Sequence, residues 1–594
     1  MSSSSPSSSS SAQKDADPIL LSVFSNRFSS IADAMGRTLE QTSISVNVKL
    51  RLDFSCALFG PDGSLVANAP NLPVHLGSMS FAVAYQIDYL GIAGIKKGDV
   101  IMANHPAAGG SHLPDITIIS PCFSEKGEII FFVASRAHHA DIGGVSPGSM
   151  PPHSKTLHEE GAQIKSFKIV EGGKYNRDGV VKHLLEDPAQ YPGCSGTRCL
   201  RDVESDLQAQ IAANQKGINL LNVLIDEWGL QMVQDYMMYI RSNAELSVRN
   251  LLKEVAKRQE TTYLYAKDYM DDGSPIELKI TIDEKDGSAF FDFEGTGPEV
   301  LGNWNCPKSV CYSAIIYCLR CMVAVDIPLN QGCLAPVTVK IPEGSLLDPS
   351  DNAAVVGGNV LTSQRITDIV LKAFKAAAAS QGDCNNLTFG MGGSDKDGKH
   401  VDGFGYYETI AGGSGAGPDW QGTDGVHVAM TNTRATDVET LERNYPVVLR
   451  RFEIRDGSGG VGRNRGGNGV TKELQFLTPQ MQVSILSERR VYHPFGLEGG
   501  GDAECGRNTW IKHEMDKDGK TQVQKRINLG GKASTMMSRG DRIIIETPGG
   551  GGWGAPDSSK AGSDRNTGDE PAGILHSGLL KGSLVERVAN QLGV

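Results

Sequence analysis

The chain has 594 residues, a formal net charge of −12 and 21% charged residues. The negative charge argues against nucleic acid and anionic membrane surfaces as partners. No apolar run approaches the roughly 18 residues that a membrane span needs. The 70 glycines are about 12% of the chain, against a usual ~7%, so they predict many tight turns and close backbone approaches.

The cysteines indicate a reducing compartment, and we expect a cytoplasmic protein. Eleven cysteines, an odd number, are scattered without the spacing of a small disulfide scaffold. Cys318 and Cys321 form a CxxC motif, but it lies within an apolar run and has no second CxxC at zinc spacing. We therefore interpret these two residues as buried structural cysteines.

The chain begins with a Ser-rich tail, residues 1–16, which has nothing to bury and is expected to be disordered. It lacks the apolar core of a secretory signal. Apolar residues at helical spacing then predict a helix over 20–39, with Asp17 as its cap and Pro18 directly after.

The following segment is predicted to alternate strand and helix. Residues 47–68 read as two strands around a Pro-Asp-Gly turn. An apolar helix is expected over 78–90. His75 is placed in the loop that precedes this helix.

Residues 104–144 hold most of the candidate metal ligands. Two runs rich in Ile, Val and Phe, residues 115–123 and 128–135, read as strands. The four residues between them suit a hairpin connection. The possible ligands in and beside this hairpin are His105, His112, Asp115, His138, His139 and Asp141.

Pairing the ends of the two strands places Asp115 opposite Arg136, with His138 as a diagonal neighbour on the same face. His139 then points to the other face, and a one-residue slip would exchange the two histidines. His112 lies just before the first strand, in a Pro-containing loop that can fold back. Since two imidazoles and a carboxylate with open positions hold catalytic divalent ions, we predict a metal site at His112, Asp115 and His138. Ordinary hydrogen bonding by loop histidines is the alternative.

Two carboxylates near this stretch are candidate catalytic groups. Asp141 lies two residues after His139, and Glu160 lies near the end of a loop over 148–161. Glu160 could supply a further ligand or a base, and a solvated surface charge is the alternative reading.

Residues 201–260 form the predicted helical region. Apolar residues recur three and four apart, and Gly217 and Gly229 mark breaks, so two or three amphipathic helices are expected. Residues 261–384 return to a mixed α/β pattern. The helices expected within it cover residues 308–324 and 364–380.

From residue 385 to residue 556 the sequence alternates Gly-rich loops with short strands, so this part is predicted to be β-rich. Residues 457–462, GSGGVG, match the dinucleotide fingerprint, but no helix follows them, so we interpret them as a turn. The chain has no GxxxxGK[ST] loop, and the residues around Ser414 do not fit a nucleophile elbow. We therefore expect no ATP site within this chain.

These patterns together predict a mixed α+β fold, heavy in Gly-rich loops, with a helical middle and a β-rich C-terminal part. The expected regions are a tail (1–16), an α/β metal-site region (17–200), a helical region (201–260), an α/β region (261–384), a β-rich Gly-loop region (385–556) and a C-terminal tail (557–594).

Several long motifs resemble the hydantoinase B/5-oxoprolinase family. They include DFSCALFGPDG (53–63), NLPVHLGSM (71–79), HPAAGGSHLPDITIISPCF (105–123), SRAHHADIGG (135–144), VVGGNVLTSQRITD (355–368) and TPGGGGWG (547–554). The resemblance spans residues 17–556 as one hydantoinase B-type unit. The motifs are most similar to the carboxyl-terminal half of the eukaryotic 5-oxoprolinases.

This resemblance implies an enzyme that acts with a partner. In the family, a hydantoinase A-type half or subunit binds ATP and phosphorylates the substrate carbonyl, and the half seen here completes the hydrolysis. The expected reaction converts 5-oxo-L-proline, ATP and two waters to L-glutamate, ADP and phosphate, a step of glutathione metabolism, in an oligomeric assembly. The alternatives are a hydantoinase subunit acting on hydantoin rings and a non-catalytic assembly partner.

The resemblance also implies a metal ion. The related acetone carboxylase carries manganese in motifs that match His112, Asp115 and His138, so we expect Mn²⁺, Mg²⁺ or Zn²⁺ here. Many family members carry a glutamate where this chain has Leu50. Asp53, three residues further on, is the substitute ligand that we expect.

Overall fold

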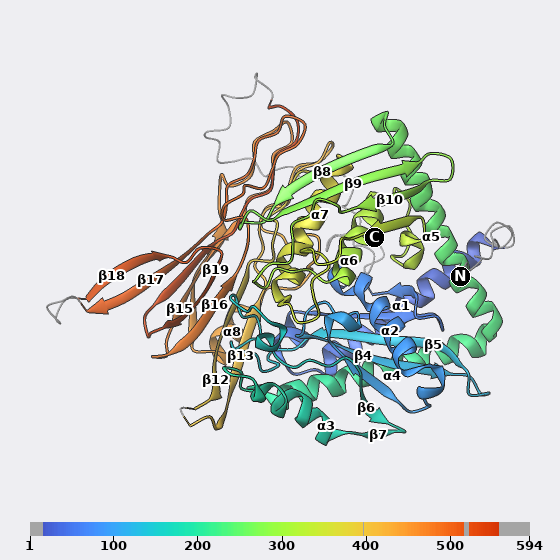
Figure 1. Ribbon diagram of the computed structural model, residues 1–594, viewed down its shortest axis with the longest axis horizontal. Helices are drawn as coiled ribbons and strands as arrows, with labels where there is room; N and C mark the ends of the chain where they lie inside the picture. Colours follow the sequence, from blue (N-terminus) through green and yellow to red (C-terminus); the bar gives the residue numbers. More distant parts are fainter. Residues whose placement is uncertain (1–15, 70, 396, 516–521, 557–594) are drawn as a thin grey trace.

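The computed structural model describes residues 16–556 except 70, 396 and 516–521, and it shows the predicted mixed α+β fold (Figure 1). The predicted tails, residues 1–16 and 557–594, lie outside the described residues except for Ala16. Helix α1 (Pro18–Thr42) confirms the first predicted helix, and its Asp17 cap accepts a hydrogen bond from the Ile19 amide. The predicted first strand begins late, because Val46–Leu50 forms a π-helical turn and β1 starts at Phe54.

The first sheet carries the metal-site region and has the strand order β2-β1-β5-β4-β3-β6-β7. Its strands are β1 (Phe54–Phe59), β2 (Leu65–Asn68), β3 (Val100–Ala103), β4 (Asp115–Phe123), β5 (Ile129–His138), β6 (Phe167–Glu171) and β7 (Lys174–Tyr175). A short helix, α3 (Arg177–Val181), follows β7.

Helices cover both faces of this sheet. Phe132 and Ala134 of β5 share a buried cluster with α2 (Pro73–Leu90), whereas the alternate residues Phe131 and Val133 join a cluster with α1 and the long helices. Coverage of both faces explains why these strands read as continuous apolar runs.

Two long helices follow, α4 (Leu200–Trp228) and α5 (Leu230–Gln259). Gly229 separates them with a φ of 81°, which a residue with a side chain rarely adopts. Gly217 does not break α4, contrary to the prediction. It gives room to the Met35 sulfur, which would lie only 2.5 Å from a Cβ at this position.

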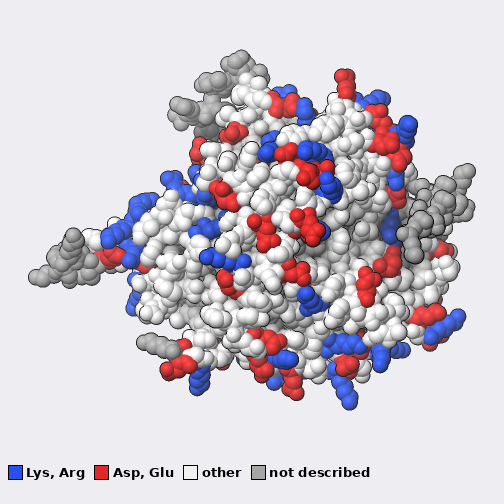
Figure 2. Space-filling view, viewed as in Figure 1, with Lys and Arg blue, Asp and Glu red and all other residues white. Residues whose placement is uncertain are grey.

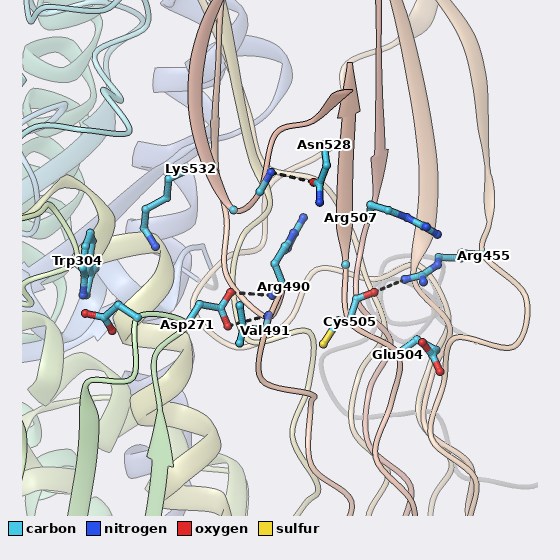
Figure 3. A pocket seen from close by; sticks show the side chains of 14 residues that line it. Asp271, Trp304, Arg455, Arg490, Val491, Glu504, Cys505, Arg507, Asn528 and Lys532 are labelled. Atoms are coloured by element: carbon cyan, nitrogen blue, oxygen red, sulfur yellow. Dashed lines mark hydrogen bonds between the residues drawn. The ribbon is translucent and has the colours of Figure 1, made fainter. Parts of the chain in front are cut away.

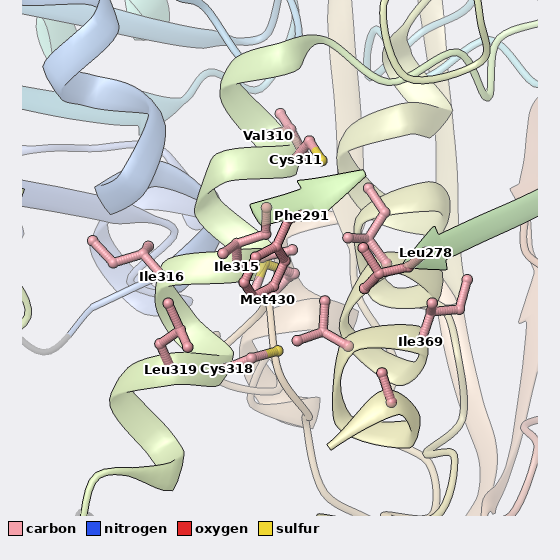
Figure 4. Close-up of a cluster of buried hydrophobic side chains, with 14 of the residues drawn as sticks. Leu278, Phe291, Val310, Cys311, Ile315, Ile316, Cys318, Leu319, Ile369 and Met430 are labelled. Atoms are coloured by element: carbon pink, nitrogen blue, oxygen red, sulfur yellow. The ribbon is translucent and has the colours of Figure 1, made fainter. Parts of the chain in front are cut away.

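The second sheet, in the order β11-β10-β9-β8, packs against two helices. Its strands are β8 (Tyr263–Tyr269), β9 (Pro275–Asp283), β10 (Ser288–Asp292) and β11 (Val337–Lys340). Figure 4 shows how α6 (Lys308–Met322) and α7 (Ser363–Ala373) meet Leu278 and Phe291 of this sheet in the largest buried cluster. Helix α7 ends seven residues before the predicted end at residue 380.

The CxxC cysteines take different places on α6. Cys318 is buried in this cluster, as predicted, whereas Cys321 is exposed. All eleven cysteines are free thiols.

The C-terminal part is β-rich, as predicted, and forms two sheets in the orders β13-β12-β16-β19 and β14-β15-β20-β17-β18. Strands β17 and β18 extend as a ribbon from the body of the molecule (Figure 1). The elements are β12 (Asn386–Ser394), β13 (His400–Glu408), α8 (Val438–Asn444), β14 (Val447–Ile454), β15 (Val470–Phe476), β16 (Met481–Leu486), β17 (Arg507–Met515), β18 (Gln522–Asn528), β19 (Lys532–Met537) and β20 (Arg542–Glu546).

The Gly-rich loops of this part pack backbone against backbone. A Cβ on Gly466 would stand 1.7 Å from the Gly550 carbonyl oxygen, and a Cβ on Gly413 would stand 2.0 Å from that of Gly467. The Gly460 amide of the GSGGVG segment donates to the Gly550 carbonyl at 2.9 Å. The segment is therefore part of a packed glycine layer and is followed by no helix.

Charged residues of both signs are interspersed over the face shown in Figure 2. Within the described residues, no helix is both long and apolar enough to span a bilayer.

Candidate metal centre

Strands β4 and β5 place Asp115 directly opposite His138. The prediction had Asp115 opposite Arg136, two residues away. One residue of the difference arises because Phe123 pairs with Ile129 and not with Glu128, and the other arises from the irregularity between Cys122 and Phe123. A shift of two residues leaves every side chain on its face, so Asp115 and His138 still share one face. His139 points away and contacts Gln210 at 3.0 Å.

The structure brings His112, Asp115 and His138 together. One potential ligand atom from each lies within 4.8 Å of the others, and all three side chains are buried. Asp115 Oδ1 is 3.0 Å from both His112 Nε2 and His138 Nδ1. The two ring nitrogens are 3.2 Å apart.

His112 is oriented by a backbone carbonyl. Its Nδ1 lies 3.2 Å from the Val356 oxygen, which can only accept, so Nδ1 carries a proton and Nε2 is directed toward Asp115. Glu160 fixes the segment that contains Val356, because its carboxylate accepts hydrogen bonds from the Val355 and Val356 amides at 3.1 and 3.0 Å. Glu160 is thus buried and not the solvated charge of the alternative reading.

His75 is a site residue that the sequence did not predict. It lies in the first turn of α2, not in a loop, and its Nε2 is 3.1 Å from Asp115 Oδ2. Asn359, from a π-helical turn (Gly358–Thr362) before α7, is the second. Its Nδ2 lies 3.1 Å from His112 Nε2. The sequence signal for both residues was their place in motifs of the family resemblance, NLPVHLGSM (71–79) for His75 and VVGGNVLTSQRITD (355–368) for Asn359.

The Ser111 hydroxyl and the Arg136 guanidinium lie beside the Asp115 carboxylate. Ser111 donates to Asp115 Oδ2 at 2.6 Å. Arg136 is fully buried and bonds Ser78, Thr117 and the Gly109 carbonyl. Burial lowers the pKa of Arg136 to about 10, and it still carries its charge at neutral pH.

The imidazoles keep the carboxylate ionised. Burial alone would raise the pKa of Asp115, but His112 and His75 hold that pKa well below its usual value. Burial would lower the pKa of His112, but Asp115 raises it, whereas burial lowers the pKa of His138. The site therefore offers one negative carboxylate and, at His138, a neutral imidazole.

A small cavity of about 10 Å³ adjoins the cluster. That volume holds one water-sized particle. Asp53, His75, Asp115, His138 and Asn359 line it. Tyr407 also lines it and stacks on His138 with ring centroids 4.1 Å apart.

Asp53 and Leu50 differ in their relation to this cavity. Asp53 is buried and on its lining, whereas the Leu50 side chain is 36% exposed and is not among the lining residues. Of the two, Asp53 is placed to contact an ion.

Three buried polar atoms at this site have no hydrogen-bond partner in the described part of the chain: His75 Nδ1, His138 Nε2 and Asn359 Oδ1. Unpartnered buried polar atoms are rare in native proteins. Nitrogen and oxygen donors around an ion-sized cavity match the preferences of Zn²⁺, Mn²⁺ and related ions. The residues present therefore fit a divalent metal.

The Asp141 carboxylate makes a different set of contacts. It accepts from the Gly143 and Gly148 amides at 3.0 Å and pairs with Arg198 at 3.1 Å. None of these bonds reaches Asp115, and they fix the loop that follows β5.

A larger hollow of about 660 Å³ lies between the β8–β9 turn and the C-terminal strands (Figure 3). Its cations are already engaged: Lys532 pairs with Glu488 at 2.5 Å and Arg490 with Asp383 at 3.0 Å. It includes no member of the histidine cluster, so size alone does not identify the chemical site.

Comparison with known proteins places the chain in a family. The hydantoinase B/oxoprolinase family model matches residues 17–556. Over 557 residues the chain is 56% identical to 5-oxoprolinase 1 of Arabidopsis thaliana, covering 92% of this chain and 42% of that protein. It is 54% identical to 5-oxoprolinase of Saccharomyces cerevisiae, covering 91% and 42%. The chain thus spans about two-fifths of the length of these relatives.

A solved structure supports the same grouping. The ATP-dependent caprolactamase from Pseudomonas jessenii aligns with a TM-score of 0.78 at 25% identity, covering 92% of this chain and 93% of that one. The family match and the fold agree with the resemblance of the motifs. The chain belongs to the hydantoinase B/oxoprolinase family.

Proposed function

We propose that this chain is the hydrolytic half or subunit of an ATP-dependent cyclic amide hydrolase, with 5-oxo-L-proline as its substrate. The observation that carries the proposal is the buried His112–Asp115–His138 group, with its unpartnered donor atoms, in a chain more than half identical to part of two proteins named 5-oxoprolinase.

In this proposal His112, Asp115, His138 and Asp53 hold a divalent ion, Mn²⁺, Mg²⁺ or Zn²⁺. When bound, such an ion supplies a Lewis acid and lowers the pKa of water. The protein's own residues fix the geometry: Val356 orients the His112 ring and Tyr407 packs against His138. Glu160 and Asp141, the candidate catalytic carboxylates, have contacts that favour positioning roles, Glu160 behind Val356 and Asp141 within its loop.

The ATP chemistry is assigned to a hydantoinase A-type partner. An amide carbonyl is a poor electrophile, and transfer of a phosphoryl group to its oxygen makes the ring carbon more electrophilic. Water then adds to that carbon, the C–N bond breaks with the amine as leaving group, and a second water releases phosphate from the resulting acyl phosphate. The chain has no P-loop, and its 5-oxoprolinase relatives carry more than half of their length outside the matched part. We propose that this remaining part corresponds to the partner, and that the two work as an oligomer in the cytoplasm, a setting that the free thiols favour.

The cavity also limits how the substrate reaches the cluster. About 10 Å³ accepts an ion or a water but not a five-membered ring. Ring opening therefore requires the lining side chains to separate when the partner delivers the activated substrate.

The test combines metal analysis with reconstitution. The purified chain should contain or take up a stoichiometric divalent ion, and with a hydantoinase A-type partner it should open 5-oxoproline only when ATP is present. His112→Ala should abolish glutamate release while ATP turnover by the partner continues. Correct assembly with neither bound ion nor product would favour the non-catalytic assembly role, and preferential opening of hydantoin rings would reassign the substrate.

A further inference from the structure

His75 contacts the centre through one ring nitrogen and leaves the other without a partner. Nε2 lies 3.1 Å from Asp115 Oδ2, whereas Nδ1 is buried with no partner among the residues described. The side chain is 1% exposed, and the ring lines the ion-sized cavity beside Asp115 and Asn359.

We propose that His75 is a positioning residue of this centre, which fixes Asp115 through Nε2 and offers Nδ1 as an acceptor to a water molecule in the adjoining cavity. The inference rests on the proposed function.

The Asp115 contact determines the tautomer of His75. Oδ2 of Asp115 is an acceptor, so the ring proton lies on Nε2. In that tautomer Nδ1 has a lone pair and acts as an acceptor.

The Nε2 contact determines which oxygen of Asp115 is free. His75 and Ser111 both bond Oδ2, at 3.1 and 2.6 Å, while Oδ1 faces His112 and His138. With Oδ2 engaged from two sides, Asp115 presents a single oxygen to an ion. Partners that orient a ligand in this way typically contribute 10–100-fold to metal affinity.

The two roles can be separated by two substitutions. His75→Gln places an amide N–H near the position of Nε2 but no acceptor near that of Nδ1, whereas His75→Asn places an acceptor near Nδ1 and does not reach Asp115. His139→Gln is the matched control, because His139 is equally buried, also has an unpartnered Nδ1, and contacts Gln210 instead of Asp115.

Metal affinity of the isolated chain tests the positioning role, by calorimetric titration with Mn²⁺ or Zn²⁺. His75→Gln and His139→Gln should stay within about threefold of wild type, and His75→Asn should lose about 10–100-fold. Circular dichroism checks that each variant is folded. Equal affinity in the Asn and Gln variants overturns the positioning role.

The assembled enzyme tests the acceptor role, through kcat for 5-oxoproline at saturating metal. His75→Gln, which keeps the Asp115 contact but has no acceptor near Nδ1, should lose at least tenfold in kcat, and His139→Gln should not. An unchanged kcat in His75→Gln overturns this role. Asp115→Asn distinguishes failure of the His75 role from failure of the proposed centre. If Asp115→Asn also binds metal with wild-type affinity, the proposed centre itself is wrong. If Asp115→Asn loses metal and the His75 variants do not, only the role of His75 is refuted.

Discussion

Two buried polar clusters in this chain, an arginine–carboxylate ion-pair cluster and the histidine cluster, differ in which atoms are left unpaired. In the ion-pair cluster, Arg489 pairs with Asp268 and Asp368 at 2.8 Å, and Arg365 pairs with Glu488 at 3.2 Å. Its unpartnered atoms include the Nε groups of Arg365 and Arg489, which are N–H donors and cannot bind a cation. In the histidine cluster, unpartnered imidazole nitrogens and an amide oxygen surround an ion-sized cavity. Burial of charge therefore does not identify a metal site, and what distinguishes the histidine cluster is that its unpaired acceptor atoms adjoin an ion-sized cavity.

The ion-pair cluster connects parts of the chain that are far apart in sequence. Asp268 belongs to β8, Arg365 and Asp368 to α7, and Glu488 and Arg489 follow β16. Burial would lower the pKa of Arg489, but Asp268 and Asp368 raise it above its ordinary value. The charges hold the second sheet against the C-terminal part, so we assign this cluster to stability, whereas we propose ligand binding for the histidine cluster.

The largest expected effect is that of Asp115→Asn on metal binding. The carboxylate is the only anionic member of the His112–Asp115–His138 group, so the variant should take up no ion and show no ring opening with the partner. Mass-spectrometric metal analysis measures the loss. The wild-type Tm should also rise with added ion and that of the variant should not, since only binding to the folded state raises Tm. Retention of one ion per chain would contradict the assignment.

Arg489→Met should lower the stability of the fold and leave metal binding unchanged. It leaves Asp268 and Asp368 without their shared partner, and breaking a buried pair typically lowers the free energy of unfolding by about 3–5 kcal/mol. Urea denaturation measures this change. Arg507→Met is the control, because its pair with Glu546 is exposed and should contribute about 0–1 kcal/mol. Similar losses in the two variants would mean that the buried cluster does not join the two parts.

Glu160→Gln should change the pH dependence of stability. Burial raises the pKa of Glu160 from 4.5 to about 7, against the hydrogen bonds that lower it. The folded chain thus binds the Glu160 proton more tightly than the unfolded chain does. The stabilising contribution of Glu160 is therefore complete below pH 4.5 and is lost as the pH rises through 7. Between pH 5 and 8, metal-free wild type should lose on the order of 2 kcal/mol more than the variant. Parallel curves from urea denaturation would show that Glu160 does not titrate in this range.

The smallest effects distinguish the two residues of the Leu50–Asp53 segment. Asp53 lines the cavity, so Asp53→Asn should weaken metal binding by about 10-fold or more, measured by calorimetric titration. Leu50→Glu should leave affinity within about threefold, because the Leu50 side chain is partly exposed and away from the lining. A tighter site in Leu50→Glu would show that the glutamate of other family members can be restored here.

The sequence predicted the parts of the site that depend on local periodicity. His138 and Asp115 share a face in any register that differs by two residues, so the wrong pairing still placed them correctly. His75 and Asn359 could not be placed in this way, because their positions depend on how α2 and α7 pack against the sheet. Gly217 was misread for the same reason: its role is set by Met35, a residue of another helix.

The glycine layer has a consequence for how relatives of this chain are interpreted. At Gly413 and Gly466 any side chain would overlap a neighbouring carbonyl, so steric exclusion should keep these positions glycine in every homologue that shares the layer. Invariance there would reflect packing and not contact with a substrate. A search for functional residues by conservation alone would therefore rank these glycine loops with Asp115 and His138. It would also assign GSGGVG as a nucleotide-binding loop, although the contacts of that segment are backbone packing within the chain.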